Sequence, residues 1–187
     1  MCIRDSLYSM YSFEALSSCQ NLLSSHDVKR FLNRCGNNED GVLGAVFLQA
    51  TFPGIAGIYY GDEIGLGGAD DPFNRAAFPW ENNKLWNTKI LQFTQDLMNI
   101  KNSNSIFKYG RFELVQNDED IVVFRRILKD ESLLCIVNRD RSNIDINVIS
   151  NAHSANIIFG ECEAKLDEGL LKITNKNSEI GLIIHEQ

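Results

Sequence analysis

The spacing of apolar residues changes near residue 105, and this change limits the chain to folds with two differently built parts. Between residues 21 and 104, short apolar runs alternate with segments of helical period, as is typical of βα units around a parallel sheet. From Ile106 onward the sequence is a series of short apolar segments, most of them bounded by polar turn residues. We therefore predict two domains, 1–104 and 105–187, the first α/β and the second all-β.

Two apolar runs of the first part end in polar residues. Residues 21–24 are predicted as a short buried strand, and residues 55–60 as a strand covered on both faces by helices. In βα folds, side chains at the carboxyl ends of parallel strands carry out the chemistry. The candidates by this rule are His26, Asp27, Asp62 and Glu63. An aspartate after a strand is also often a helix cap or part of a loop ion pair, so spacing alone leaves both interpretations open.

The rest of the first part predicts two helices and a long loop. The run 42–50 is apolar nearly all round, which indicates a helix buried on several sides. Residues 65–83 are rich in glycine, proline and aspartate and predict an irregular loop of the kind that is usually functional. Asn82 or Asn83 can cap the helix that follows. Its apolar stripe has helical spacing: Trp86, Ile90, Phe93, Leu97 and Ile100.

The second part is predicted as an antiparallel β-sandwich. Turn signals such as 117–118, 129–130 and 140–143 separate most of its apolar segments. The predicted strands cover residues 111–115, 121–126, 133–137, 144–148, 155–159, 170–173 and 180–185.

Charge and composition exclude several classes of protein. The formal net charge is −7 and no basic cluster is present, which argues against a nucleic-acid partner. The most apolar stretch, 44–60, is interrupted by polar residues and proline, so no transmembrane helix and no membrane partner are predicted. The first ten residues lack the apolar core of a secretory signal. The five cysteines are scattered and the three histidines have no ligand spacing, which indicates reduced thiols, a cytoplasmic location and no metal site.

Three segments resemble motifs of one enzyme family, in the family's order and spacing. Residues 21–32 read NLLSSHDVKRFL, residues 52–65 read FPGIAGIYYGDEIG, and residues 67–75 read GGADDPFNR, followed by Pro79 and Trp80. They are similar to the strand-seven motif, the strand-eight motif and a donor-side sugar-binding segment of the α-amylase superfamily, glycoside hydrolase family 13. The serine-histidine-aspartate form of the first motif resembles neopullulanases, cyclomaltodextrinases and maltogenic amylases.

The resemblance implies a fold and roles for four residues. The first part would be the end of a (β/α)₈ TIM barrel, with strands seven and eight, and the second part the family's C-terminal β-sandwich. Asp27 matches the carboxylate that stabilises the oxocarbenium-like transition state, and His26 matches an imidazole that binds the same sugar. Asp71 and Arg75 match positions that contact a more distant glucose. The sequence departs from the family pattern at Ser24, where aspartate is common, and at 76–77, where arginine and proline are usual.

The resemblance also implies that the catalytic machinery is incomplete. A retaining glycosidase needs a nucleophile and a general acid, which in this family lie on strands four and five. We find no counterpart of those strands, and a full barrel takes about 250 residues. We therefore interpret the chain as an inactive C-terminal fragment of a retaining glycoside hydrolase. Its substrates would be malto-oligosaccharides, cyclodextrins or pullulan.

Two other interpretations stay open. The parent can be a non-catalytic glycan-binding or partner protein with a glycosidase-like barrel, or the second part can be a sandwich that only supports a barrel. The expected partner is an α-glucan oligosaccharide, with no cofactor, and a homodimer of the full-length parent is left open. Residues 1–6 match nothing in the family pattern, and we interpret them as a junction that is foreign to the protein.

Overall fold

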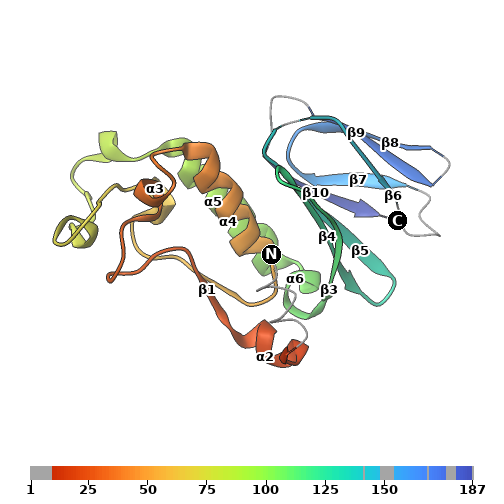
Figure 1. Cartoon of the computed structure of the whole chain (residues 1–187), viewed down its shortest axis with the longest axis horizontal. Coiled ribbons are helices and arrows are strands. Elements are labelled where there is room, and N and C mark those ends of the chain that lie inside the picture. Colours follow the sequence, from red (N-terminus) through yellow and green to blue (C-terminus); the bar gives the residue numbers. More distant parts are fainter. Residues whose placement is uncertain (1–9, 141, 148–153, 168, 176–179, 187) are drawn as a thin grey trace. The chain divides into compact units, whose positions relative to one another are not determined.

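The computed structural model describes residues 10–140, 142–147, 154–167, 169–175 and 180–186 (Figure 1). The chain forms two compact units, divided between Ser103 and Asn104. Residues 1–6, interpreted above as a junction, lie outside the described residues. No helix in the described part of the chain is long and apolar enough to cross a membrane.

Within its described residues, the first unit contains helices, two short strands and single turns of 3₁₀ helix. In chain order they are α2 (Phe13–Ser18), β1 (Gln20–Leu22), α3 (Phe31–Arg34), α4 (Glu39–Thr51), β2 (Ile55–Gly57), η1 (Asp62–Ile64), η2 (Phe73–Arg75), η3 (Asn83–Leu85) and α5 (Thr88–Ser103).

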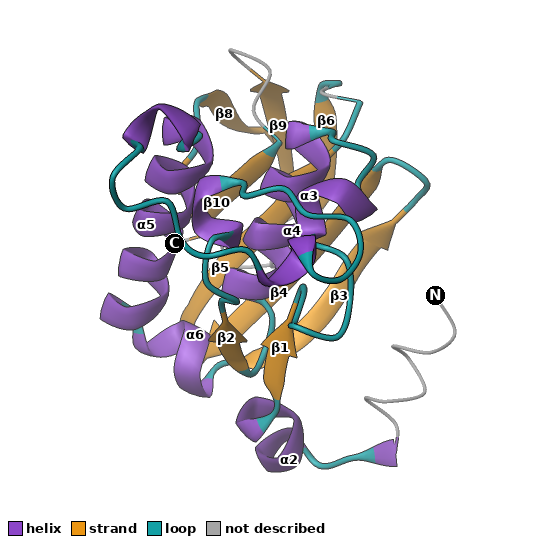
Figure 2. Cartoon of the chain, turned by 90° about the vertical axis from the view of Figure 1, so that its left-hand side faces the viewer, coloured by secondary structure: helices purple, strands orange, loops and turns teal. Residues whose placement is uncertain are grey.

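Strands β1 and β2 are parallel neighbours joined by the helices α3 and α4 (Figure 2). Asn21 pairs with Ala56 at the centre of the register. The buried amide of Gln49 in α4 donates to the carbonyl oxygens of Asn21 and Gly57, at 2.8 and 2.7 Å, and so fixes the helix against both strands. The pairing confirms the βα arrangement predicted for the first part, and it directs the residues after both strands toward the same edge.

Strand β2 is shorter and more exposed than predicted. It ends at Gly57, whereas the sequence pattern predicted a strand to Tyr60. Ile55 is 57% exposed and Ile58 is 41% exposed, so the expectation that both faces are covered was wrong. Helix α4 is buried on several sides, as predicted, and it covers one face of the strand pair. The other face, which carries Leu22 and Ile55, is open to solvent.

Helix α5 begins later than predicted. The side-chain oxygen of Asn87 accepts hydrogen bonds from the backbone N–H groups of Lys89 and Ile90, so Asn87 is the cap in place of Asn82 or Asn83. Asn82 precedes η3 and makes no capping bond. Within the predicted stripe, Ile90 and Leu97 are buried, and α5 packs along α4.

The described part of the second unit forms one short helix and two antiparallel sheets. Sheet order is β3-β4-β5-β10-β7 in the five-stranded sheet and β6-β9-β8 in the three-stranded sheet. The elements are α6 (Ser105–Tyr109), β3 (Arg111–Asn117), β4 (Ile121–Leu128), β5 (Glu131–Asn138), β6 (Ile144–Asn147), β7 (Ala155–Phe159), β8 (Cys162–Asp167), β9 (Leu170–Asn175) and β10 (Gly181–Glu186).

Strand β8 was not predicted from the sequence. Its apolar positions are Cys162, Ala164 and Leu166, and charged residues alternate with them and point to solvent. The alternation has a period of two, but cysteine and alanine are weak indicators of a strand and glutamate, lysine and aspartate are depleted in strands. The two sheets share one hydrophobic cluster, to which β4, β5 and β10 contribute from one sheet and β6, β8 and β9 from the other.

Candidate active site

The loop after β1 presents His26 and Asp27 to solvent. Their side chains are 63% and 70% exposed, and His26 Nε2 lies 3.2 Å from Asp27 Oδ1. Helix α3 has Arg30 at its N-cap and no capping side chain, so Asp27 is not a helix cap. The backbone N–H of Asp27 donates to Ser25 Oγ at 3.2 Å, which bends the chain within the loop. An exposed carboxylate beside an imidazole is available to bind sugar hydroxyl groups.

Asp71 and Arg75 lie against the same loop. Arg75 Nε is 3.2 Å from Asp71 Oδ1 and also donates to the carbonyl oxygen of His26 at 3.1 Å. The structure therefore brings together all four predicted site residues. Asp71 joins Arg75, Arg75 bonds the backbone of His26, and the His26 side chain contacts Asp27.

Asn74 joins the loop that contains Asp71 and Arg75 to the loop after β1. It is 4% exposed, and its amide nitrogen donates to the carbonyl oxygens of His26 and Val28, at 2.9 and 3.2 Å. Tyr60 Oη donates to the carbonyl oxygen of Ala76 at 3.0 Å. Because this bond uses backbone, the departure from the family pattern at Ala76 leaves it intact.

Asp62 and Glu63 make structural contacts. Glu63 accepts the backbone N–H of Gly61 at 2.7 Å. Asp62 is buried, accepts the hydroxyl hydrogen of Ser24 and faces the guanidinium of Arg30. Burial raises the pKa of Asp62 above its usual value, although the Ser24 hydrogen bond and Arg30 oppose the shift and the charge of Glu63 adds to it.

The raised pKa predicts how the stability of this unit depends on pH. Above the usual value of 3.8, the unfolded chain releases the Asp62 proton while the folded unit keeps it until its own higher pKa is passed. The folded state binds more protons in this window, so the free energy of unfolding falls as pH rises through it. Asp62→Asn removes the titration, and we expect the variant to gain stability relative to the unsubstituted chain as pH rises.

Urea unfolding at several pH values measures this difference. Trp80 and Trp86, the two tryptophans of the chain, lie in the same unit as Asp62, so their fluorescence reports its unfolding. A difference between Asp62→Asn and the unsubstituted chain that is constant with pH, or that shrinks as pH rises, contradicts the prediction.

Sequence reasoning missed Arg30 and Asn74, both of which are buried beside the predicted residues. Arginine and asparagine are usually exposed, and no local pattern marks the exceptions. Asn74 lies just after Asp71 and Pro72, in the loop that was predicted to be functional. That position is the one sequence feature that could have marked it as a site residue.

An apolar groove of about 590 Å³ lies elsewhere in the first unit, and the four predicted residues do not line it. It is lined by Ile58, Ile64, residues of α5 and three aromatic rings that contact one another: Phe78, Trp80 and Trp86. Within the described residues, no group of three or more histidine, cysteine, aspartate or glutamate side chains could hold a metal ion.

Comparison with known proteins identifies a family over more than half of the chain. Residues 8–117 match the family model of the α-amylase catalytic domain. The chain is 32% identical over 169 residues to the amylopullulanase of Thermoanaerobacterium thermosulfurigenes, covering 76% of this chain and 9% of that protein. It is 37% identical over 122 residues to the intracellular maltogenic amylase of Bacillus subtilis, covering 64% of this chain and 21% of that protein.

Solved structures extend the similarity to nearly the whole chain. The debranching enzyme of Nostoc punctiforme superposes with a TM-score of 0.84 at 30% identity, over 97% of this chain and 38% of that one. The chain thus spans far less than two thirds of the length of these relatives. With the catalytic-domain model matching more than half of its residues, the chain belongs to the α-amylase family.

Proposed function

We propose that the chain is the C-terminal part of a retaining glycoside hydrolase that cleaves α-glucosidic bonds in malto-oligosaccharides, cyclodextrins or pullulan. The observation that carries the proposal is the exposed His26–Asp27 pair, 3.2 Å apart, in the loop directly after a parallel strand. In this proposal β1 and β2 are strands seven and eight of a TIM barrel, and the two antiparallel sheets form the C-terminal sandwich.

The open face of the β1–β2 pair supports the barrel assignment. Leu22 and Ile55 are 53% and 57% exposed, and they lie on the face opposite to α4. Isolated two-stranded sheets with an open apolar face are marginally stable in water, whereas a closed barrel has no edges. The apolar groove beside Ile58 fits the same account, because a barrel would place further elements against it.

In the proposed mechanism Asp27 neither attacks nor protonates the substrate. Its carboxylate stabilises the positive charge that develops on the sugar ring in the transition state, and His26 binds a hydroxyl group of the same sugar. Asp71 and Arg75 contact a glucose unit further along the chain of sugars. The nucleophile and the general acid come from the remainder of the protein. A cytoplasmic location is part of the proposal, supported by the similarity to the intracellular maltogenic amylase.

Expression of the complete reading frame tests the proposal. We expect the complete protein to release reducing sugar from at least one of the three substrates, and the 187-residue chain to show no turnover. Hydrolysis by the chain alone, or none by the complete protein, contradicts the proposal. Sugar binding by the complete protein without hydrolysis favours the non-catalytic glycan-binding alternative.

A further inference from the structure

We propose that Arg30 is a positioning residue that holds the loop carrying His26 and Asp27 against the residues that follow β2. This inference rests on the proposed function and deepens it. Arg30 lies three residues after Asp27 and its side chain is fully buried, so it cannot itself touch a sugar.

The guanidinium of Arg30 is enclosed by the segment after β2. Its central carbon lies 4.4 Å from the ring centroid of Tyr59 and 4.5 Å from that of Tyr60. Nη1 donates to the carbonyl oxygen of Tyr60. Nε and Nη2 have no hydrogen-bond acceptor among the described residues, and the faces of the two rings supply the compensating cation–π interaction.

Asp62 connects Arg30 to Ser24, at the two ends of the loop that carries His26 and Asp27. Arg30 Nη1 is 3.9 Å from Asp62 Oδ1, and Asp62 Oδ2 accepts the hydroxyl hydrogen of Ser24. Ser24 precedes the two candidate residues and Arg30 follows them. Both ends of the segment 24–30 are therefore fastened to the same short stretch after β2.

The backbone near Arg30 also fits closely around its side chain and its N–H group. Gly61 has a φ of +91°, and a Cβ there would lie 3.2 Å from Arg30 Nη1 and 2.8 Å from Leu66. A larger residue at position 61 would be strained at this φ and would crowd the guanidinium. The backbone N–H of Arg30 donates to the carbonyl oxygen of Gly68 at 2.9 Å, which ties the loop that leads to Asp71 to the same point.

These contacts predict that Arg30 acts on catalysis through the placement of Asp27. A displacement of about 1 Å in a positioned group can cost about 100-fold in rate. Arg30→Lys keeps the charge but loses the planar guanidinium that lies 4.4 and 4.5 Å from the centroids of the two tyrosine rings. In the complete protein we expect it to lower kcat/KM for a malto-oligosaccharide by about 100-fold. We expect Arg30→Met to lower it further, and the Ki of acarbose to rise in parallel with both losses.

The matched control is Arg34→Lys, an exposed arginine on α3 that donates to the carbonyl oxygen of Leu23 at 2.9 Å. It should stay within about twofold of the unsubstituted protein, since lysine keeps the charge and can still donate to that carbonyl oxygen. All rates are measured well below the melting temperature and per folded molecule. A purely structural Arg30 would lower the melting temperature but leave kcat/KM and the acarbose Ki unchanged, and that result overturns the inference.

Ser24→Ala keeps the test decisive if the Arg30 variants do not fold. It removes the hydrogen bond from Ser24 to Asp62 without removing a charge. A kcat/KM loss of about 5- to 10-fold with a parallel rise in the acarbose Ki supports the inference, as expected for the loss of one hydrogen bond of ordinary strength. Unchanged values overturn it. If the unsubstituted complete protein does not hydrolyse α-glucans, the proposed function fails first and the inference with it.

Discussion

Asp27→Asn in the complete protein is expected to lower kcat by at least about 100-fold while leaving the melting temperature nearly unchanged. The amide has the shape of the carboxylate but lacks its charge, so it cannot stabilise the positive charge of the oxocarbenium-like transition state. The side chain is 70% exposed and it contacts the side chain of His26, which is 63% exposed, so the fold does not depend on it. Initial rates on malto-oligosaccharides and a thermal melt measure the two quantities.

Asp70→Asn is the matched control for Asp27→Asn. Asp70 is an exposed aspartate of the loop that leads to Asp71, and its carboxylate lies 3.5 Å from Lys29 Nζ. Exposed ion pairs contribute little, so this variant should retain nearly full activity. If Asp27→Asn also retains most of its activity, the role assigned to Asp27 is wrong.

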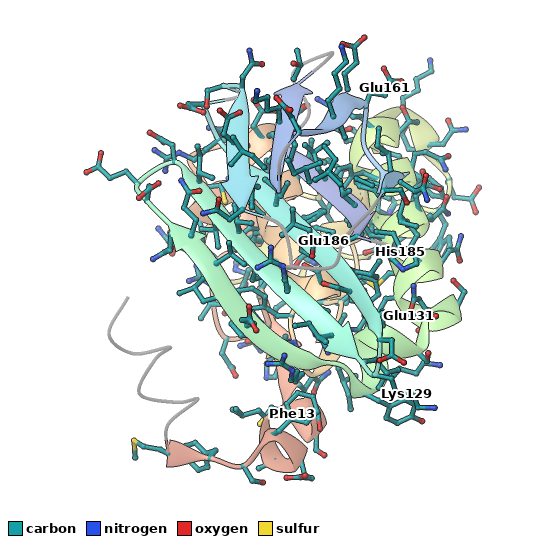
Figure 3. All side chains as sticks on the ribbon, turned by 90° about the vertical axis from the view of Figure 1, so that its right-hand side faces the viewer. Phe13, Lys129, Glu131, Glu161, His185 and Glu186 are labelled. Atoms are coloured by element: carbon teal, nitrogen blue, oxygen red, sulfur yellow. The ribbon has the colours of Figure 1, made fainter. Side chains whose placement is uncertain are left out.

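Glu186→Ala is expected to destabilise the second unit by about 3–5 kcal/mol, because it removes the buried carboxylate that pairs with the buried Arg125. Glu186 lies on β10 (Figure 3) and is 1% exposed. Its carboxylate accepts two hydrogen bonds from Arg125, from Nε at 2.8 Å and from Nη2 at 3.0 Å. Ser132 Oγ donates a third at 2.8 Å. The pair links β4 and β10 across the intervening strand β5.

Urea unfolding followed by far-ultraviolet circular dichroism measures the loss, because both tryptophans lie in the other unit. Glu113→Gln is the control: Glu113 also faces Arg125, with Oε1 3.6 Å from Nη1, but its side chain is 41% exposed. It should cost less than about 1 kcal/mol. Equal effects of the two substitutions would show that burial does not set the strength of this ion pair.

The parts of the fold that the sequence predicted are those with local signals. Strands β1 and β2 could be recognised as short apolar runs. The polar residues after them could be recognised too, because they follow each run directly along the chain. The four site residues were identified through motif resemblance, and the structure places them together. The cap of α5 was misplaced because three asparagines precede the helix, and only the local hydrogen bonds distinguish Asn87.

Features that depend on distant segments could not be predicted. The burial of Arg30 arises because residues 59–62, about thirty positions away, wrap around it. The exposure of Ile55 and Ile58 depends on what packs against the sheet and leaves no trace in their own sequence. Strand β8 is recognisable only beside β9, since antiparallel pairing with Leu171 and Ile173 gives its weak apolar positions a partner.

A structure of the complete protein with acarbose bound tests the central claim most directly. The account predicts that the Asp27 carboxylate and the His26 imidazole both lie within hydrogen-bond reach, about 2.6–3.2 Å, of hydroxyl groups on one sugar ring. It also predicts that Arg75 stays bonded to the backbone of His26, as it is here. A sugar bound in the barrel mouth with Asp27 and His26 both out of reach would contradict the account.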